Sequence, residues 1–216
     1  MITIINFKTY PAASGKKAVV LARICDKIAR AKKHAVALAV QAYDIAAVSS
    51  AVQIPVLAQH IDAMDPGAHT GWMAAASAKN AGAIGSLLNH SEHPISLSEI
   101  KKTIIKLREN KLLSIVCAPT AAMVKKIAAL KPDVVAFEPP ELIGGNKSVS
   151  GTKPREVKNA VKAANGIPLL CGAGIKTRAD VLKAQELGVQ GILISSGIVN
   201  AKSPKKVLKE LLIYRK

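Results

Sequence analysis

The chain alternates, from one end to the other, between short apolar runs rich in β-branched residues and longer amphipathic segments. The apolar runs predict strands, and the segments between them predict helices because their apolar residues recur at helical spacing or because they open with a capping residue or proline. The connections are short and no linker interrupts the series. Eight such units predict one α/β domain, a closed (β/α)₈ barrel spanning residues 1–216. The predicted strands are 2–7, 35–40, 55–58, 83–88, 112–117, 133–137, 167–170 and 191–194; the predicted helices are 15–31, 44–50, 71–80, 96–109, 120–130 and three that begin at Pro154, Thr177 and Pro204.

The composition agrees with a parallel sheet that is covered on both faces. Half of the residues are hydrophobic but only 3% are aromatic, so Ala, Val, Ile and Leu must build the core. A doubly wound open sheet is the alternative architecture. Its glycine-rich fingerprint should follow the first strand, whereas here that strand ends in Asn6-Phe7-Lys8. We therefore favour the barrel.

No apolar run approaches the roughly 20 residues that cross a membrane, and no signal-peptide pattern precedes Ile2. The cysteines Cys25, Cys117 and Cys171 are odd in number and widely spaced. They predict free thiols in a reducing compartment rather than a disulfide framework or a zinc site. We expect a cytoplasmic protein without a membrane partner.

The formal net charge is +17, and lysines occur in pairs, nearly all of them within the predicted helices. If the helices surround a barrel, the pairs form a solvated outer ring that attracts anions. Nucleic acid is the alternative partner for such a charge. No arginine-rich segment, aromatic platform or zinc-finger spacing supports it, so we expect no dedicated nucleic-acid binding.

Three chemically useful side chains stand at the ends of predicted strands. Lys8 follows the first strand, His90 the fourth and Glu138 the sixth. The carboxyl ends of all strands meet at one face of a closed parallel barrel. Each residue alone is more often structural or solvated, but the three in matching contexts predict a shared site at that face.

The segment after Glu138 has the composition of an active-site lid. Two prolines, Pro139 and Pro140, brace one hinge, Leu142 and Ile143 form an apolar tip, and two glycines follow. A loop of this kind closes over a base and excludes water. An ordinary strand-to-helix turn with an exposed glutamate is the alternative.

Two further loops are suited to holding a phosphate group. Cys171-Gly172-Ala173-Gly174 follows the seventh strand, and Ser195-Ser196-Gly197 follows the eighth. Glycine lets backbone N–H groups approach an anion, serine adds hydroxyl donors, and barrels commonly hold phosphate after these two strands. Tight turns that need positive φ are the alternative interpretation.

Glutamate, histidine and lysine without a cofactor fit abstraction of a proton next to a carbonyl group. Glu138 would take the carbon-bound proton, while His90 and Lys8 would stabilise the oxygen that gains charge. Metal catalysis is the alternative, because His60, His69, Asp62 and Asp65 lie on the third loop. Their spacing matches no recognised set of ligands, so we expect neither a metal nor a cofactor.

The ordered motifs together resemble the triosephosphate isomerase family, in its short archaeal form. The resemblance runs from Ile2 to the last helix and rests on five motifs: Asn6-Phe7-Lys8, Asn89-His90-Ser91-Glu92, Glu138-Pro139-Pro140-Glu141-Leu142-Ile143-Gly144, Cys171-Gly172-Ala173-Gly174 and Ser195-Ser196-Gly197. It implies the family's TIM-barrel fold and interconversion of dihydroxyacetone phosphate and glyceraldehyde 3-phosphate. A glutamate base beside a neutral histidine is an established feature of that family.

The resemblance also assigns roles. It makes Glu138 the base, His90 the electrophile and Lys8 the cation that anchors the substrate, with Glu92 positioning Lys8. The substrate-binding residues that it implies are Asn6, Phe7, Lys8, Ile143, Gly174, Ser195 and Ser196.

The third loop, Gln59 through Gly71, resembles the family's interface loop, so a homodimer is expected and a homotetramer is an alternative. Two segments depart from the family pattern: Gly144–Ser148 in the lid, and Val40–Asp44 after the second strand. Neither contains a predicted catalytic residue. Another phosphosugar isomerase or synthase on the same barrel is the nearest alternative, since phosphate loops are widely shared.

Overall fold

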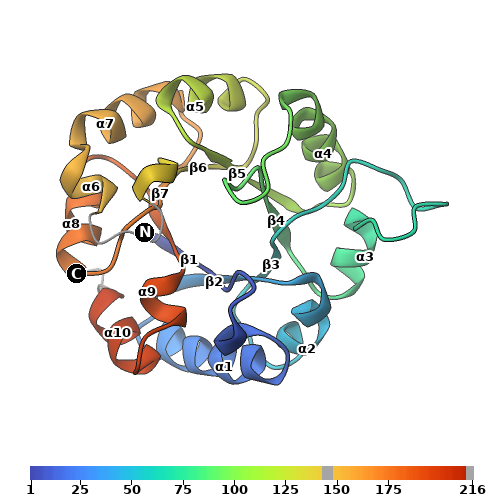
Figure 1. Cartoon of the computed structure of the whole chain (residues 1–216), viewed down its shortest axis with the longest axis horizontal. Helices are drawn as coiled ribbons and strands as arrows, with labels where there is room; N and C mark the ends of the chain where they lie inside the picture. The colour runs from blue at the N-terminus through green and yellow to red at the C-terminus, as the bar shows by residue number, and fades with distance from the viewer. Residues whose placement is uncertain (143–147, 213–216) are drawn as a thin grey trace.

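Strand pairing closes the sheet on itself. The computed structural model describes residues 1–142 and 148–212. Within these residues the strands follow one another around a closed barrel in chain order, all parallel, and β1 completes the ring by pairing with β8. This confirms the predicted barrel (Figure 1). The strands are β1 (Ile2–Asn6), β2 (Ala35–Val40), β3 (Val56–Ala58), β4 (Gly85–Leu88), β5 (Leu113–Ala118), β6 (Val134–Phe137), β7 (Leu169–Cys171) and β8 (Gly191–Ile194).

Helices form an outer ring around the barrel (Figure 1). The α-helices are α1 (Lys16–Ala31), α2 (Ile45–Ser49), α3 (Ala75–Asn80), α4 (Leu97–Glu109), α5 (Ala121–Ala128), α6 (Val149–Thr152), α7 (Pro154–Ala163), α8 (Arg178–Glu186), α9 (Ser196–Val199) and α10 (Pro204–Leu211). Three short 3₁₀ turns lie between them: η1 (Pro11–Ala13), η2 (Ala42–Asp44) and η3 (Pro140–Leu142).

Alternation along each strand creates two hydrophobic layers. Successive side chains of a strand point to opposite faces, so Ile4 packs inside the barrel while Ile5 packs between barrel and helices. The inner layer is narrow and includes three alanines, which explains how few aromatic residues this core needs. Its members are Ile4, Ala37, Ala39, Leu57, Leu87, Ile115, Cys117, Ala136, Leu170 and Leu193.

Reciprocal capping boxes fix where two of the described helices begin. Ser96 and Glu99 form a reciprocal capping box at the start of α4, as the sequence predicts. Thr177, the predicted N-cap of α8, forms a second box with Asp180. The sequence did not indicate the four-residue helices α6 and α9, because one turn carries too little periodicity to recognise. The helix predicted at 71–80 is shorter than expected and begins at Ala75.

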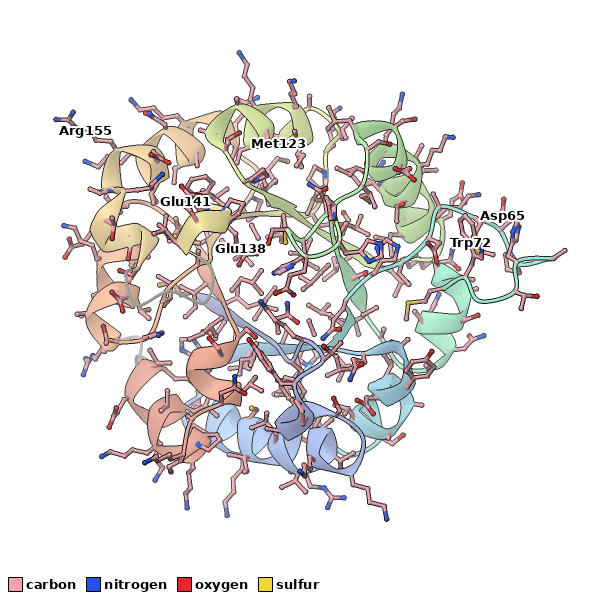
Figure 2. All side chains as sticks on the ribbon, in the orientation of Figure 1. Asp65, Trp72, Met123, Glu138, Glu141 and Arg155 are labelled. Carbon is pink, nitrogen blue, oxygen red and sulfur yellow. The ribbon has the colours of Figure 1, made fainter. Side chains whose placement is uncertain are left out.

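The charged surface lies on the outer helices. In Figure 2 many long side chains extend outward from the helical ring, and the predicted lysine pairs on α1, α4, α5 and α10 are exposed. Lys32 is the half-buried exception, because its ammonium group donates to the backbone carbonyls of Lys209 and Leu212. Among the described residues, no helix is long and apolar enough to cross a membrane.

Candidate active site at the carboxyl ends of the strands

One cavity opens at the carboxyl ends of the strands and is lined by most of the predicted site residues. Figure 2 shows Glu138 close to the centre of the ring, whereas Trp72 and Arg155 lie at its periphery. The predicted residues that line the cavity are Asn6, Lys8, His90, Glu138, Gly174, Ser195 and Ser196. The sequence therefore placed side chains from five strands at one site.

Lys8 adopts an unusual backbone conformation at the end of β1. Its φ of +48° lies in the left-handed region, which a residue with a Cβ rarely occupies. The Lys8 N–H donates to Oδ1 of Asn6 at 2.9 Å. Its ammonium group lies 2.5 Å from a carboxylate oxygen of Glu92, and only 12% of the Lys8 side chain is exposed. Lys8 lines the cavity, and this ion pair holds its ammonium group in one place; that Glu92 positions Lys8 for the substrate stays a prediction.

His90 is presented by another left-handed residue, Asn89, at φ +55°. The Asn89 side chain donates to the carbonyl of Cys117 and accepts from the N–H of Ile95, which fixes the turn. His90 is buried, and its Nδ1 accepts the N–H of Glu92 at 3.2 Å, which places the ring proton on Nε2. Burial lowers the pKa of His90, and the nearby Lys8 lowers it further, against an opposing effect of Glu92. The imidazole is thus a neutral N–H donor at neutral pH.

Glu138 is a buried carboxylate directly opposite that donor. One of its oxygens, Oε2, lies 3.7 Å from Nε2 of His90 and makes no hydrogen bond to any described residue. Burial raises the pKa of Glu138 from 4.5 to about 7, although a hydrogen bond from the Cys117 thiol opposes the shift. A base whose pKa lies near the working pH is matched to proton transfer.

Gly172, at the end of β7, leaves the space that Glu138 occupies. A Cβ built on Gly172 would overlap the Glu138 side chain, with Cδ only 2.6 Å away. We expect Gly172→Ala to push the carboxylate away from His90 and to lower kcat/KM by roughly 10²-fold, the cost of about 1 Å of misplacement. Steady-state kinetics would check this. Unchanged turnover would mean that Glu138 acts from another position.

The residues that follow β7 and β8 form a wall of the cavity that carries groups suited to an anion. The hydroxyl of Ser195 is buried without a hydrogen-bond partner among the described residues. Ala173 and Gly174 are consecutive left-handed residues, at φ +68° and +70°. The loop after β7 is therefore a tight turn with positive φ, as the alternative interpretation predicts, and it also lines the cavity. Gly197 and Lys176 complete this wall.

Among the predicted substrate-binding residues that the structure describes, Phe7 alone is absent from this lining. Phe7 is fully buried in the core between barrel and helices, where its N–H donates to the carbonyl of Ala39. Its side chain therefore has no access to the cavity. Ile143 and the glycines of the predicted lid fall outside the described residues, and the described part of that segment ends in the η3 turn at Leu142.

The third loop does not gather metal ligands. His60 stacks on His93 with ring centroids 4.2 Å apart, while Asp62 accepts from His60 and from the N–H of Met73. Within 1–142 and 148–212, no group of three or more His, Cys, Asp and Glu side chains is placed to hold a metal ion.

The sequence did not predict the part that three residues play in supporting this site. Gln59 binds the end of β1, Gly172 makes room for the carboxylate, and the Cys117 thiol contacts it. The sequence contains a sign of the role of Gln59. This residue directly follows β3, and Lys8 follows β1, so both lie at the face where the carboxyl ends of the strands meet. The sequence places Gly172 in a predicted phosphate loop, but its steric role depends on the side-chain conformation of Glu138, which is distant in the chain.

The comparisons with known proteins agree with this geometry. The family model described as triosephosphate isomerase matches residues 1–211. A triosephosphate isomerase of Methanothermus fervidus is 46% identical over 98% of this chain and 97% of its own. That of Archaeoglobus fulgidus is 44% identical, with 97% and 96% covered. The crystal structure of the Bartonella henselae triosephosphate isomerase is only 16% identical but shares the fold, with a TM-score of 0.77 over 95% of this chain and 96% of that one. This chain belongs to the triosephosphate isomerase family.

Proposed function

We propose that this protein interconverts dihydroxyacetone phosphate and D-glyceraldehyde 3-phosphate through an enediolate. The observation that carries the proposal is the pairing of a buried carboxylate of raised pKa with a neutral N–H donor, 3.7 Å apart in one cavity. Membership of the family supports the same reaction. No cofactor is required, because the reaction moves protons within one substrate.

The two proton transfers assign a role to each side chain. Glu138 takes a proton from C1 of dihydroxyacetone phosphate, and the electron pair of that C–H bond moves to form the enediolate. His90 donates its Nε2–H to the substrate oxygen, and the Lys8 ammonium stabilises the charge that gathers there. Glu138 then returns a proton to C2, which restores the carboxylate. The proton of the C1 hydroxyl passes to Nε2 of His90, so the C1 oxygen becomes the aldehyde carbonyl and the imidazole is neutral again.

The phosphate group of the substrate would lie against the wall formed by the residues that follow β7 and β8, which we call the phosphate wall. Ser195, Ser196 and Gly174 supply hydroxyl and backbone N–H donors there, and the unpartnered Ser195 hydroxyl supports this placement. Ile143 would add a further backbone group. Lys8 and Asn6 would then contact the substrate between the phosphate and the reacting carbons.

The raised pKa of Glu138 predicts the pH dependence of catalysis. Only the carboxylate form is a base, so kcat/KM should fall as the pH drops below about 7, approaching tenfold per pH unit. The phosphate group of the substrate has a second pKa near 6, so its protonation would cause a further fall in kcat/KM at a pH about one unit lower. Kinetics from pH 5.5 to 9 would resolve the two. A profile that is flat down to pH 6 would contradict the proposed environment of the base.

We further propose that the protein is a homodimer or homotetramer assembled through the third loop. This loop lies between β3 and α3 and extends outward from the barrel wall (Figure 1). Trp72, which directly follows this loop, is 60% exposed, and Tyr43 in the segment after β2 is 96% exposed. Exposed aromatic side chains are typical of interfaces. Sedimentation analysis should give at least twice the chain mass, whereas a monomer would contradict the proposal.

The proposed cellular context follows from the reaction. Interconversion of triose phosphates belongs to glycolysis and gluconeogenesis, and we propose a cytoplasmic location. The buried free thiols Cys25, Cys117 and Cys171 support a reducing compartment.

An assay of purified protein tests the proposed function. Dihydroxyacetone phosphate should be converted to glyceraldehyde 3-phosphate, detected by oxidation with a coupling dehydrogenase, and the reverse reaction should also proceed. Other phosphorylated ketoses and aldoses of five and six carbons serve as comparison substrates. Turnover of one of those, without turnover of the trioses, would favour a different phosphosugar isomerase on this barrel.

A further inference from the structure

We infer that Gln59 is a positioning residue for Lys8, holding the lysine backbone in its left-handed conformation so that the ammonium group reaches the substrate. This inference rests on the substrate-anchoring role proposed for Lys8. It adds a residue of the third loop to the groups on which substrate binding depends.

The hydrogen bonds of Gln59 converge on the end of β1. Its amide nitrogen donates to Oδ1 of Asn6 at 3.2 Å, to the carbonyl of Lys8 at 3.1 Å and to the carbonyl of Ala39 at 3.2 Å. The two N–H groups of one amide are thus shared among three oxygens of β1 and β2. A half-buried side chain with this many partners has one defined orientation.

Both backbone polar groups of Lys8 are held as a result. Its N–H donates to Asn6 Oδ1, the same oxygen that Gln59 contacts, and its carbonyl accepts directly from Gln59. The left-handed region at φ +48° is disfavoured for lysine, so such a conformation persists only where its surroundings over-determine it. Gln59 supplies that restraint from outside the strand.

The position of the Lys8 backbone also affects the reacting groups of the site. The Lys8 ammonium group pairs with the carboxylate of Glu92, and the N–H of Glu92 donates to Nδ1 of His90. If the Lys8 backbone relaxes toward a common conformation, the start of the side chain turns and the ammonium group leaves this position. Loss of Gln59 should therefore weaken binding of an anionic substrate by way of Lys8.

The variant Gln59→Met keeps the length of the side chain and removes the amide. We expect it to weaken binding of phosphoglycolate, a phosphorylated two-carbon acid, by about tenfold or more, with a matching rise in KM. Gln190→Met is the matched control. The Gln190 amide also bonds a backbone group, the N–H of Leu169, but at the opposite end of the barrel. It should change phosphoglycolate affinity less than twofold even if it lowers Tm.

A double-mutant cycle separates positioning of Lys8 from a general structural effect. In a Lys8→Met background, measured by phosphorus NMR titration, adding Gln59→Met should change affinity less than twofold, because the group it positions is gone. The same loss in both backgrounds would overturn the inference. If Lys8→Met itself binds phosphoglycolate like the intact protein, the anchoring role of Lys8 fails, and this inference fails with it.

A shorter amide provides the test if Gln59→Met does not fold. Gln59→Asn keeps both N–H groups but withdraws them by one methylene from the Lys8 carbonyl. It should fold and weaken phosphoglycolate binding in the same direction by a smaller factor, again only when Lys8 is present. Unchanged affinity in a folded Gln59→Asn protein would overturn the inference.

Discussion

Replacing Glu138 by glutamine should lower kcat by at least ~10²-fold, a typical share for a general base. Glutamine keeps the shape of the side chain that fits above Gly172 but cannot accept the carbon-bound proton. Phosphoglycolate should still bind, because the phosphate wall is unchanged. The measurement is steady-state turnover beside inhibitor affinity. Glu186→Gln, an exposed change on α8, is the matched control and should leave turnover unchanged.

The same substitution should make the protein more stable. Because the folded-state pKa of Glu138 is raised from 4.5 to about 7, the folded protein binds a proton more tightly than the unfolded chain. The contribution of this group to the free energy of unfolding is therefore fully present below pH 4.5 and is lost as the pH rises through 7. The loss is roughly 3 kcal/mol, because each unit of pKa shift corresponds to about 1.4 kcal/mol.

The stability of Glu138→Gln should thus exceed that of the intact protein above pH 7, and the two should converge toward pH 4.5. Urea denaturation at both pH values measures this. An inactive variant that is also less stable at pH 8 would mean that the loss of turnover reports damage to the fold rather than loss of the base.

Placing a carboxylate on the phosphate wall should abolish substrate binding. Ser195→Asp puts a negative charge where the hydroxyl is buried without a partner, within reach of the proposed phosphate dianion. Two unit charges about 4 Å apart repel by roughly 4 kcal/mol near a protein surface, so phosphoglycolate affinity should fall by at least ~10²-fold.

Ser77→Asp adds the same charge on the exposed face of α3 and should leave that affinity nearly unchanged. Circular dichroism and Tm of both variants verify that the barrel is intact. If Ser195→Asp binds phosphoglycolate as tightly as Ser77→Asp does, the phosphate group lies elsewhere in the cavity.

The barrel could be predicted because its signal is repeated along the chain. Each β-branched run is buried on both faces, so it reads as a continuous apolar strand, as in Val36 to Val40. Lys8, His90 and Glu138 could be grouped because parallel strands in a closed barrel share one face for their carboxyl ends. That rule needs only the position of each residue after a strand.

What the sequence could not provide depends on side-chain orientation. Phe7 lies between Asn6 and Lys8 but points into the core, since neighbouring residues of a strand face opposite ways. The contacts of Gln59 with β1 join residues about fifty positions apart in the chain. The raised pKa of Glu138 likewise arises from burial beneath several elements, and no local pattern encodes it.

Isomerisation in deuterium oxide tests the central claim most directly, because it follows the proton that Glu138 is proposed to carry. Dihydroxyacetone phosphate is incubated with the protein, and the glyceraldehyde 3-phosphate formed is trapped by oxidation and examined by proton NMR. We predict deuterium at C2 of part of the product from the intact protein, and loss of both product and exchange in Glu138→Gln. Product formed by Glu138→Gln at the rate of the intact protein and with the same deuterium content at C2 would contradict proton transfer through this carboxylate.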